Sequence, residues 1–145
     1  MSYSYEYPRP AVTVDVLVLA HQTRQILLIQ RGNEPFKGLW ALPGGFVDMD
    51  EDLPTAALRE LAEETGIKGI QIKQFNTYGG VDRDPRHRTI SIVYTSVINK
   101  PVAAKGMDDA ADARWFSVDE LPQLAFDHQL IIDEAIALFQ KDGIL

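Results

Sequence analysis

The sequence predicts an α/β fold in which one mixed β-sheet packs between helices. Residues 11–20 are apolar or β-branched at nearly every position, and several shorter segments share this strand-like composition. Two further segments, one between Asp52 and Gly66 and one over 130–139, have helical character. No repeat, low-complexity tract or linker interrupts the chain, so we expect a single domain over residues 1–145.

Composition narrows the class of protein. The 145 residues are 46% hydrophobic, which is enough for one proper core. The net charge of −7, with no run of lysine or arginine, argues against nucleic acid as a partner of this domain. Cysteine is absent, which excludes disulfides and thiolate metal sites. Without a signal-like amino end or a long apolar run, we expect a cytoplasmic protein with no membrane partner.

Residues 1–30 predict an extended segment followed by two strands. Residues 1–10 are rich in tyrosine and proline and should lie extended or pack on a neighbouring subunit, and base stacking is the alternative use of the tyrosines. Residues 11–20 suit a central strand covered on both faces, where Asp15 needs a partner, either structural or a substrate hydroxyl. A short turn then favours an antiparallel hairpin with residues 25–30.

Residues 31–42 predict an irregular loop and a short strand that lead to Gly44 and Gly45. Two adjacent glycines allow backbone to approach a ligand, and a carbonyl there is a candidate metal ligand. Arg31 is a candidate phosphate contact, with a structural salt bridge as the alternative.

The next helix should be short and carry an acidic face. Asp52 is the expected cap, Pro54 suits the first turn and Gly66 the end. Helical spacing places three glutamates on one side, which would repel each other without a cation such as Mg²⁺ or Mn²⁺ between them. The acidic face comprises Glu60, Glu63 and Glu64, and the core face Leu58, Leu61 and Thr65. The alternative is an ordinary solvated acidic face.

After this helix, residues 70–78 and 89–98 have strand composition, joined by an arginine-rich loop. Arg83, Arg86 and Arg88 are candidate substrate-binding residues because arginine binds phosphate in bidentate fashion. Local Asp–Arg pairs in a solvated loop are the alternative. Residues 99–112 should be a loop, 113–117 the last strand and 130–139 the second helix.

Several motifs resemble the Nudix hydrolase family. Every defined position of the Nudix box is present, namely Gly45, Glu51, Arg59-Glu60-Leu61, Glu63-Glu64 and Gly66-Ile67. The loop around Asp84-Pro85-Arg86 resembles the D-P-R-G segment of a subgroup acting on ADP-ribose, with His87 in place of glycine. The segment RWFSVDELPQLAFDHQLII is similar to the closing section of the same subgroup.

This resemblance implies an α/β/α sandwich and a Mg²⁺-dependent hydrolase, with Mn²⁺ as a possible substitute, that splits ADP-ribose into AMP and ribose 5-phosphate. It implies that Glu60 and Glu64 are the principal metal ligands and that the Gly45 carbonyl completes the set. Glu63 would be shared between metals or act as the base, and Arg59 would orient the glutamates. Asp108 or Asp109 would complete the metal site or assist the water, and a homodimer is expected.

Two alternatives accompany this prediction. One is another Nudix chemistry, such as hydrolysis of oxidised nucleoside triphosphates or dinucleoside polyphosphates. The other is an ADP-ribose-sensing domain, because transcriptional regulators of NAD metabolism carry a similar Nudix-like domain. The complete box favours the enzyme, since such sensors often have eroded boxes.

Overall fold

Strand β1 (Ala11–Ala20) is the centre of a mixed sheet in a computed structural model that describes residues 2–145. It pairs in parallel with β6 (Thr89–Ile98) along its whole length, and β5 (Lys73–Tyr78) lies antiparallel on the far side of β6. The predictions for 11–20 and 89–98 are confirmed with their bounds. The strand predicted over 70–78 begins only at Lys73.

The other edge of β1 is shared by two strands. Strand β2 (Gln25–Arg31) is antiparallel to β1 but pairs with it only at residues 19 and 20, whereas β4 (Gly44–Phe46) pairs with residues 13–15. Strands β3 (Trp40–Ala41) and β7 (Ala110–Ser117) both lie antiparallel to β2. The predicted hairpin is therefore confirmed, but β2 soon diverges from β1 and β4 takes its place.

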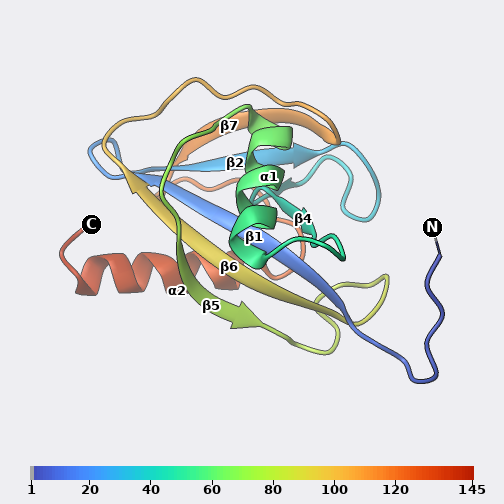
Figure 1. Ribbon diagram of the computed structural model, residues 1–145. Helices are drawn as coiled ribbons and strands as arrows, with labels where there is room; N and C mark the ends of the chain where they lie inside the picture. Colours follow the sequence, from blue (N-terminus) through green and yellow to red (C-terminus); the bar gives the residue numbers. More distant parts are fainter. Residues whose placement is uncertain (1) are drawn as a thin grey trace.

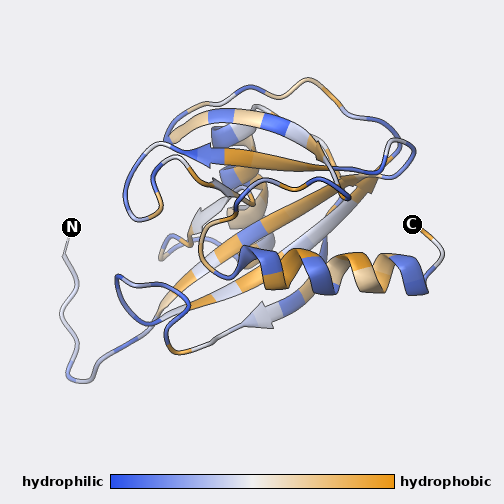
Figure 2. Cartoon of the chain, turned by 180° about the vertical axis from the view of Figure 1, so that it is seen from behind, coloured by the Kyte–Doolittle hydropathy of each residue, from blue (hydrophilic) through white to orange (hydrophobic). Residues whose placement is uncertain are grey.

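Helix α1 (Leu53–Thr65) covers one face of the sheet and α2 (His128–Lys141) the other (Figures 1 and 2). Successive side chains of a strand point to opposite faces, so alternate residues of β1 enter two separate cores. Val14, Val16 and Val18 pack in the cluster that contains Leu61 of α1, and Leu17 and Leu19 pack in the cluster that contains Ile131 and Phe139 of α2. The expected α/β/α sandwich is confirmed.

The bounds of α1 follow the expected signals only in part. Proline stands in the first turn, and Gly66 ends the helix with a left-handed φ of 78°. Asp52 occupies the N-cap position, so that prediction is confirmed, although its side chain makes no cap hydrogen bond. Leu58 is a correction, because it is 37% exposed while Ala57 and Leu61 are fully buried.

Elements near the carboxyl end are longer than predicted. Strand β7 begins at Ala110 instead of 113 because its pairing with β2 continues through Arg31, and α2 extends beyond 130–139 at both ends. Residues 2–10 form neither helix nor strand and lead away from the sheet (Figure 1). Within residues 2–145, no helix has the length and apolar character needed to cross a membrane.

Candidate active site

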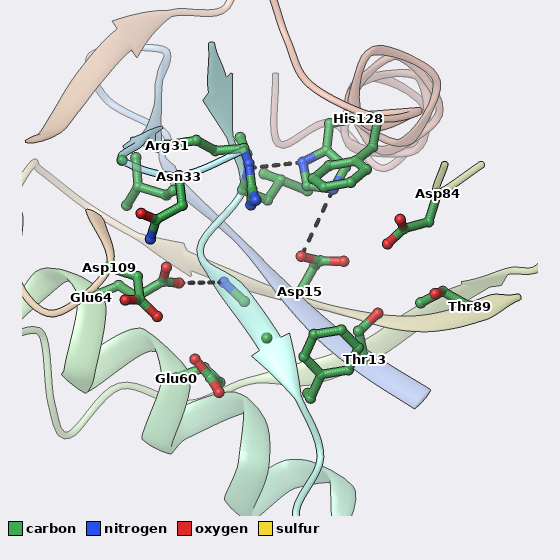
Figure 3. Close-up of a pocket in the computed structure, with 18 of the residues that line it drawn as sticks. Thr13, Asp15, Arg31, Asn33, Glu60, Glu64, Asp84, Thr89, Asp109 and His128 are labelled. Atoms are coloured by element: carbon green, nitrogen blue, oxygen red, sulfur yellow. Dashed lines mark hydrogen bonds and ion pairs between the residues drawn. The ribbon is translucent and has the colours of Figure 1, made fainter. Parts of the chain in front are cut away.

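A cavity of about 300 Å³ lies where β2 diverges from β1. Its walls come from β1, β4, α1, the 79–88 loop and the start of α2, so residues from both sides of the sheet reach it (Figure 3). Ionisable side chains dominate the lining, and acids outnumber bases. The acids are Asp15, Glu34, Glu60, Glu64, Asp84, Asp108 and Asp109, and the arginines are Arg31, Arg83 and Arg86.

Two glutamates of α1, Glu60 and Glu64, face this cavity. Glu64 is 8% exposed, and its Oε1 accepts the backbone N–H of Gly44 at 2.7 Å. Burial raises the pKa of Glu64 to about 8 and also raises the pKa of Glu60. Gly45 makes room for Glu60, because a Cβ at that position would lie 2.5 Å from its carboxylate.

Arg59 connects the loop before α1 to the glutamates on it. Its Nη1 donates to Glu60 at 2.9 Å and to Glu63 at 3.2 Å, while Nε and Nη2 donate to Glu51. Nη2 also reaches the Phe46 carbonyl at 3.1 Å. The hydrogen bonds from Arg59 lower the pKa of Glu51 to about 2. Arg59 therefore fixes the glycine-rich loop against the acidic helix.

The three glutamates do not share one solvated face, which corrects the simple two-sided helix predicted above. Glu64 is buried, Glu60 is largely buried, and the side chain of Glu63 is 41% exposed. Glu63 does not line the cavity. Within residues 2–145, no three acidic or histidine side chains are gathered closely enough to enclose a metal ion.

The pair Glu60 and Glu64 nevertheless fits a divalent cation. Both are hard oxygen donors that face one cavity, and both are buried at a cost to their ionised form that a cation would offset. The missing side chain at Gly45 keeps backbone close to Glu60. These observations match Mg²⁺ or Mn²⁺ better than a metal that prefers nitrogen or sulfur.

Replacing Arg59 with lysine should lower kcat/KM of the Mg²⁺-dependent hydrolysis that the resemblance implies. The expected loss is about 10- to 100-fold, the usual effect of losing a residue that orients metal ligands. Lysine is a single point charge and cannot hold Glu51, Glu60 and Glu63 at once. Steady-state kinetics would measure the loss. Arg114→Lys is the matched control, since Arg114 is an exposed arginine paired with Asp112. Equal activity of Arg59→Lys and parent would contradict the orienting role.

Three of the four predicted substrate arginines line the cavity, namely Arg31, Arg83 and Arg86. Arg31 donates Nε to the Pro35 carbonyl at 2.7 Å and makes no ion pair among residues 2–145, so the alternative of a structural salt bridge is wrong. Burial, followed by repulsion from Arg86, lowers the pKa of Arg31. Arg86 is held by Asp84 through Nε and Nη2, which leaves Nη1 without a hydrogen bond within the described chain.

Arg83, although it lines the cavity, and Arg88 also hold the loop itself. Arg83 donates Nε and Nη2 to Asp127 at 2.9 and 2.7 Å and thereby ties the loop to the start of α2. Arg88 donates Nη1 to the Gly79 carbonyl at 2.7 Å and does not line the cavity. The loop thus contains the Asp–Arg pairs of the alternative prediction, and the roles of Arg83 and Arg88 toward substrate stay predictions.

Asp108 and Asp109, the candidates for an additional acid, both line the cavity. Asp108 has a positive φ of 54°, and the Asp109 carbonyl accepts the Gly32 N–H at 3.3 Å. Backbone bonds from Lys105 and Met107 dock this loop on the end of α1. The loop therefore brings its acids to the glutamate side of the cavity.

His128 and Thr13 are lining residues that sequence analysis did not propose for the site. Asp15 was noted as needing a partner, but the sequence left that partner open. The available signal was a charge inside an otherwise apolar strand. The fold places Asp15 beside α2, with its Oδ1 3.8 Å from Nε2 of His128 (Figure 3).

Comparison with known proteins identifies the family. Residues 9–139 match the NUDIX domain. The chain belongs to the NUDIX family. It is 45% identical over 129 residues to the ADP-ribose pyrophosphatase of Methanocaldococcus jannaschii, covering 88% of this chain and 74% of that protein. The predicted Nudix pyrophosphohydrolase class is thereby confirmed.

A second group of NUDIX relatives consists of regulators. The chain is 37% identical to the ADPR responsive transcriptional repressor NtrR of Acinetobacter baylyi, covering 91% of this chain but 55% of the repressor, so it spans about half the length of that relative. The NUDIX domain of Shewanella oneidensis NrtR complexed with ADP ribose superposes with a TM-score of 0.85 at 34% identity, covering 92% and 90% of the two chains.

Proposed function

We propose that this Nudix hydrolase cleaves the diphosphate of a nucleoside diphosphate linked to a second group, and that ADP-ribose is the substrate. Water adds to one phosphorus and the bridging oxygen leaves on the other phosphate, giving AMP and ribose 5-phosphate. The observation that carries the proposal is one cavity that combines the buried Glu60 and Glu64 pair with free donors on Arg31 and Arg86. The 45% identity to an ADP-ribose pyrophosphatase supports the choice of substrate.

We propose Mg²⁺ as the cation, held by Glu60, Glu64 and the Gly45 carbonyl, with Glu63 as a further ligand or the base. When bound, a divalent cation stabilises negative charge on diphosphate oxygens and lowers the pKa of water. Arg31 and Arg86 present guanidinium donors to the phosphates, which matches their preference for planar oxyanions. Asp108 and Asp109 are the lining acids available to take a proton from the attacking water.

A substrate panel tests the reaction. We expect Mg²⁺-dependent release of AMP from ADP-ribose, abolished by EDTA, with kcat/KM at least about tenfold above that for an oxidised nucleoside triphosphate or a dinucleoside polyphosphate. Product analysis by chromatography distinguishes AMP from other fragments. Preferential turnover of the triphosphate would overturn the choice of substrate while leaving the hydrolase class intact.

A second candidate is an ADP-ribose-sensing domain. The similarity to NtrR, and to a NUDIX domain complexed with ADP ribose, favours it. The two candidates differ in turnover. Tight ADP-ribose binding without AMP release in Mg²⁺ or Mn²⁺ would establish the sensor. A homodimer and a cytoplasmic location stay predictions, the first measurable by light scattering.

A further inference from the structure

His128, the first residue of α2, points a defined hydrogen-bond donor at the cavity. Its Nδ1 accepts the backbone N–H of Leu42 at 3.0 Å, and the residue is 3% exposed. A backbone N–H can only donate, so Nδ1 carries no proton and the neutral ring is protonated on Nε2. Nε2 is therefore a donor, and it cannot serve as a metal ligand in this arrangement.

The Nε2 donor has no hydrogen-bond partner within the described chain. Asp15 Oδ1 is 3.8 Å away, which is too far for a hydrogen bond. Within residues 2–145, no side-chain nitrogen or oxygen is both fully buried and without a hydrogen bond. Nε2 therefore keeps some accessibility, and the cavity that His128 lines provides it. A nearly buried side chain thus directs an unused donor into the site (Figure 3).

Asp15 supplies the matching acceptor. Its Oδ2 accepts the Ser91 hydroxyl, which leaves Oδ1 without a hydrogen bond among residues 2–145. Asp15 is 7% exposed and lines the same cavity. Thr13, two residues earlier on the same face of β1, also lines the cavity, and its hydroxyl makes no hydrogen bond within the described residues. The Nε2 donor of His128 and the Oδ1 acceptor of Asp15 therefore lie close together at the cavity.

The chemistry of this pair selects a hydroxyl. An oxygen about 2.8 Å from each atom can accept from Nε2 and donate to Oδ1 at once, which only an alcohol or water does. A phosphate would meet the Asp15 carboxylate, and a cation would meet the Nε2 donor. The other charged groups acting on His128 are Asp127, Arg83 and Arg31, and Asp127 is already bonded to Arg83. A sugar hydroxyl arriving with substrate can displace a water from this position.

We propose that Asp15 and His128 bind a hydroxyl of the substrate sugar and so determine specificity for a ribose-containing diphosphate. This inference rests on the proposed function and deepens it. The hydroxyl belongs either to the distal ribose or to the ribose of the nucleoside. A hydrogen bond to a charged group, with a buried partner left unpaired in its absence, predicts about a 10- to 100-fold effect on affinity.

His128→Asn is the central variant. The asparagine Oδ1 is as many bonds from Cα as Nδ1, so it keeps an acceptor for Leu42 while the Nε2 donor is lost. His128→Gln instead carries an amide N–H at the level of Nε2 and should recover part of the affinity. Asp15→Asn removes the charge and is expected to weaken binding about as much as His128→Asn. A cooperative melt of each variant establishes that it folds.

Calorimetry of the full chain with three probes tests the subsite, in Ca²⁺ to limit turnover and again in EDTA. The probes are ADP-ribose, ADP without the distal sugar, and a dideoxyadenosine analogue of ADP-ribose without the nucleoside hydroxyls. His128→Asn should weaken the binding of ADP-ribose about 10- to 100-fold. If the distal ribose is bound, ADP affinity stays unchanged, and if the nucleoside ribose is bound, the affinity of the dideoxy analogue stays unchanged.

Either of these patterns supports the subsite and identifies its sugar. If His128→Asn weakens the binding of all three probes equally, or does not weaken the binding of ADP-ribose, the subsite is overturned while the proposed function stays in place. Failure of the parent chain to bind ADP-ribose under both conditions would overturn the proposed function and the subsite together.

Discussion

Replacing Glu64 with glutamine should reduce Mg²⁺-dependent hydrolysis of ADP-ribose on the order of 10³-fold, since a metal ion supplies several kcal/mol of charge stabilisation. Glutamine has the same shape and can still accept the Gly44 N–H through its amide oxygen. The fold is therefore kept while the negative charge is lost. Initial rates of AMP release in saturating Mg²⁺ measure the effect.

The same variant should be more stable than the parent chain when metal is removed. Burial raises the pKa of Glu64 to about 8 from an ordinary value of 4.5, so the folded state holds a proton that the unfolded state releases. The associated stability is complete below pH 4.5 and is lost as pH rises through 8. Glutamine does not titrate, so the Tm advantage of Glu64→Gln in EDTA should grow from pH 6 to 9, reaching about 5–10 °C.

Adding Mg²⁺ should make the parent chain more stable than Glu64→Gln, because a ligand that binds only the folded state stabilises it. The parent Tm should rise with Mg²⁺, more strongly at pH 9 than at pH 6 since the carboxylate must be ionised to bind. Glu120→Gln, an exposed glutamate near the end of β7, is the matched control and should behave as the parent. Retention of parent activity by Glu64→Gln would remove Glu64 from the metal site.

Replacing Gly44 with alanine should destabilise the fold by about 3 kcal/mol or more, the upper end of the cost of overpacking. An added Cβ would overlap the Val14 carbonyl oxygen and the Asp15 carboxylate, and the first of these is backbone that cannot rotate away. The expected fall in Tm is about 10 °C. Thermal unfolding followed by circular dichroism gives the value.

Gly79→Ala is the matched control for this substitution. The nearest atom to a Cβ at Gly79 is Cγ1 of Ile90 at 3.9 Å, which is ordinary contact, and the expected change in Tm is within about 2 °C. Similar behaviour of the two variants would show that β4 can move away from β1, contrary to the close pairing of Gly44 with Asp15. Because Gly44 also holds Glu64, the destabilised variant should lose activity as well.

Local patterns predicted the individual elements well, for physical reasons that are visible in particular residues. The run of 11–20, apolar at nearly every position, predicted a strand buried on both faces, and its alternating side chains do enter two cores. Gly66 ends α1 in the left-handed conformation that glycine tolerates best. The error at Leu58 arose because spacing does not reveal which side of a helix meets the sheet.

The sequence by itself determined the α/β class, the NUDIX box and the type of chemistry, because these depend on residue types at short, fixed spacings. Only the tertiary structure decided that Glu60 and Glu64 face the cavity while Glu63 faces solvent. It also decided that Asp15 lies beside His128, more than a hundred residues away in the chain. Burial and tautomer are set by neighbours that are distant in sequence, so no local pattern could have specified them.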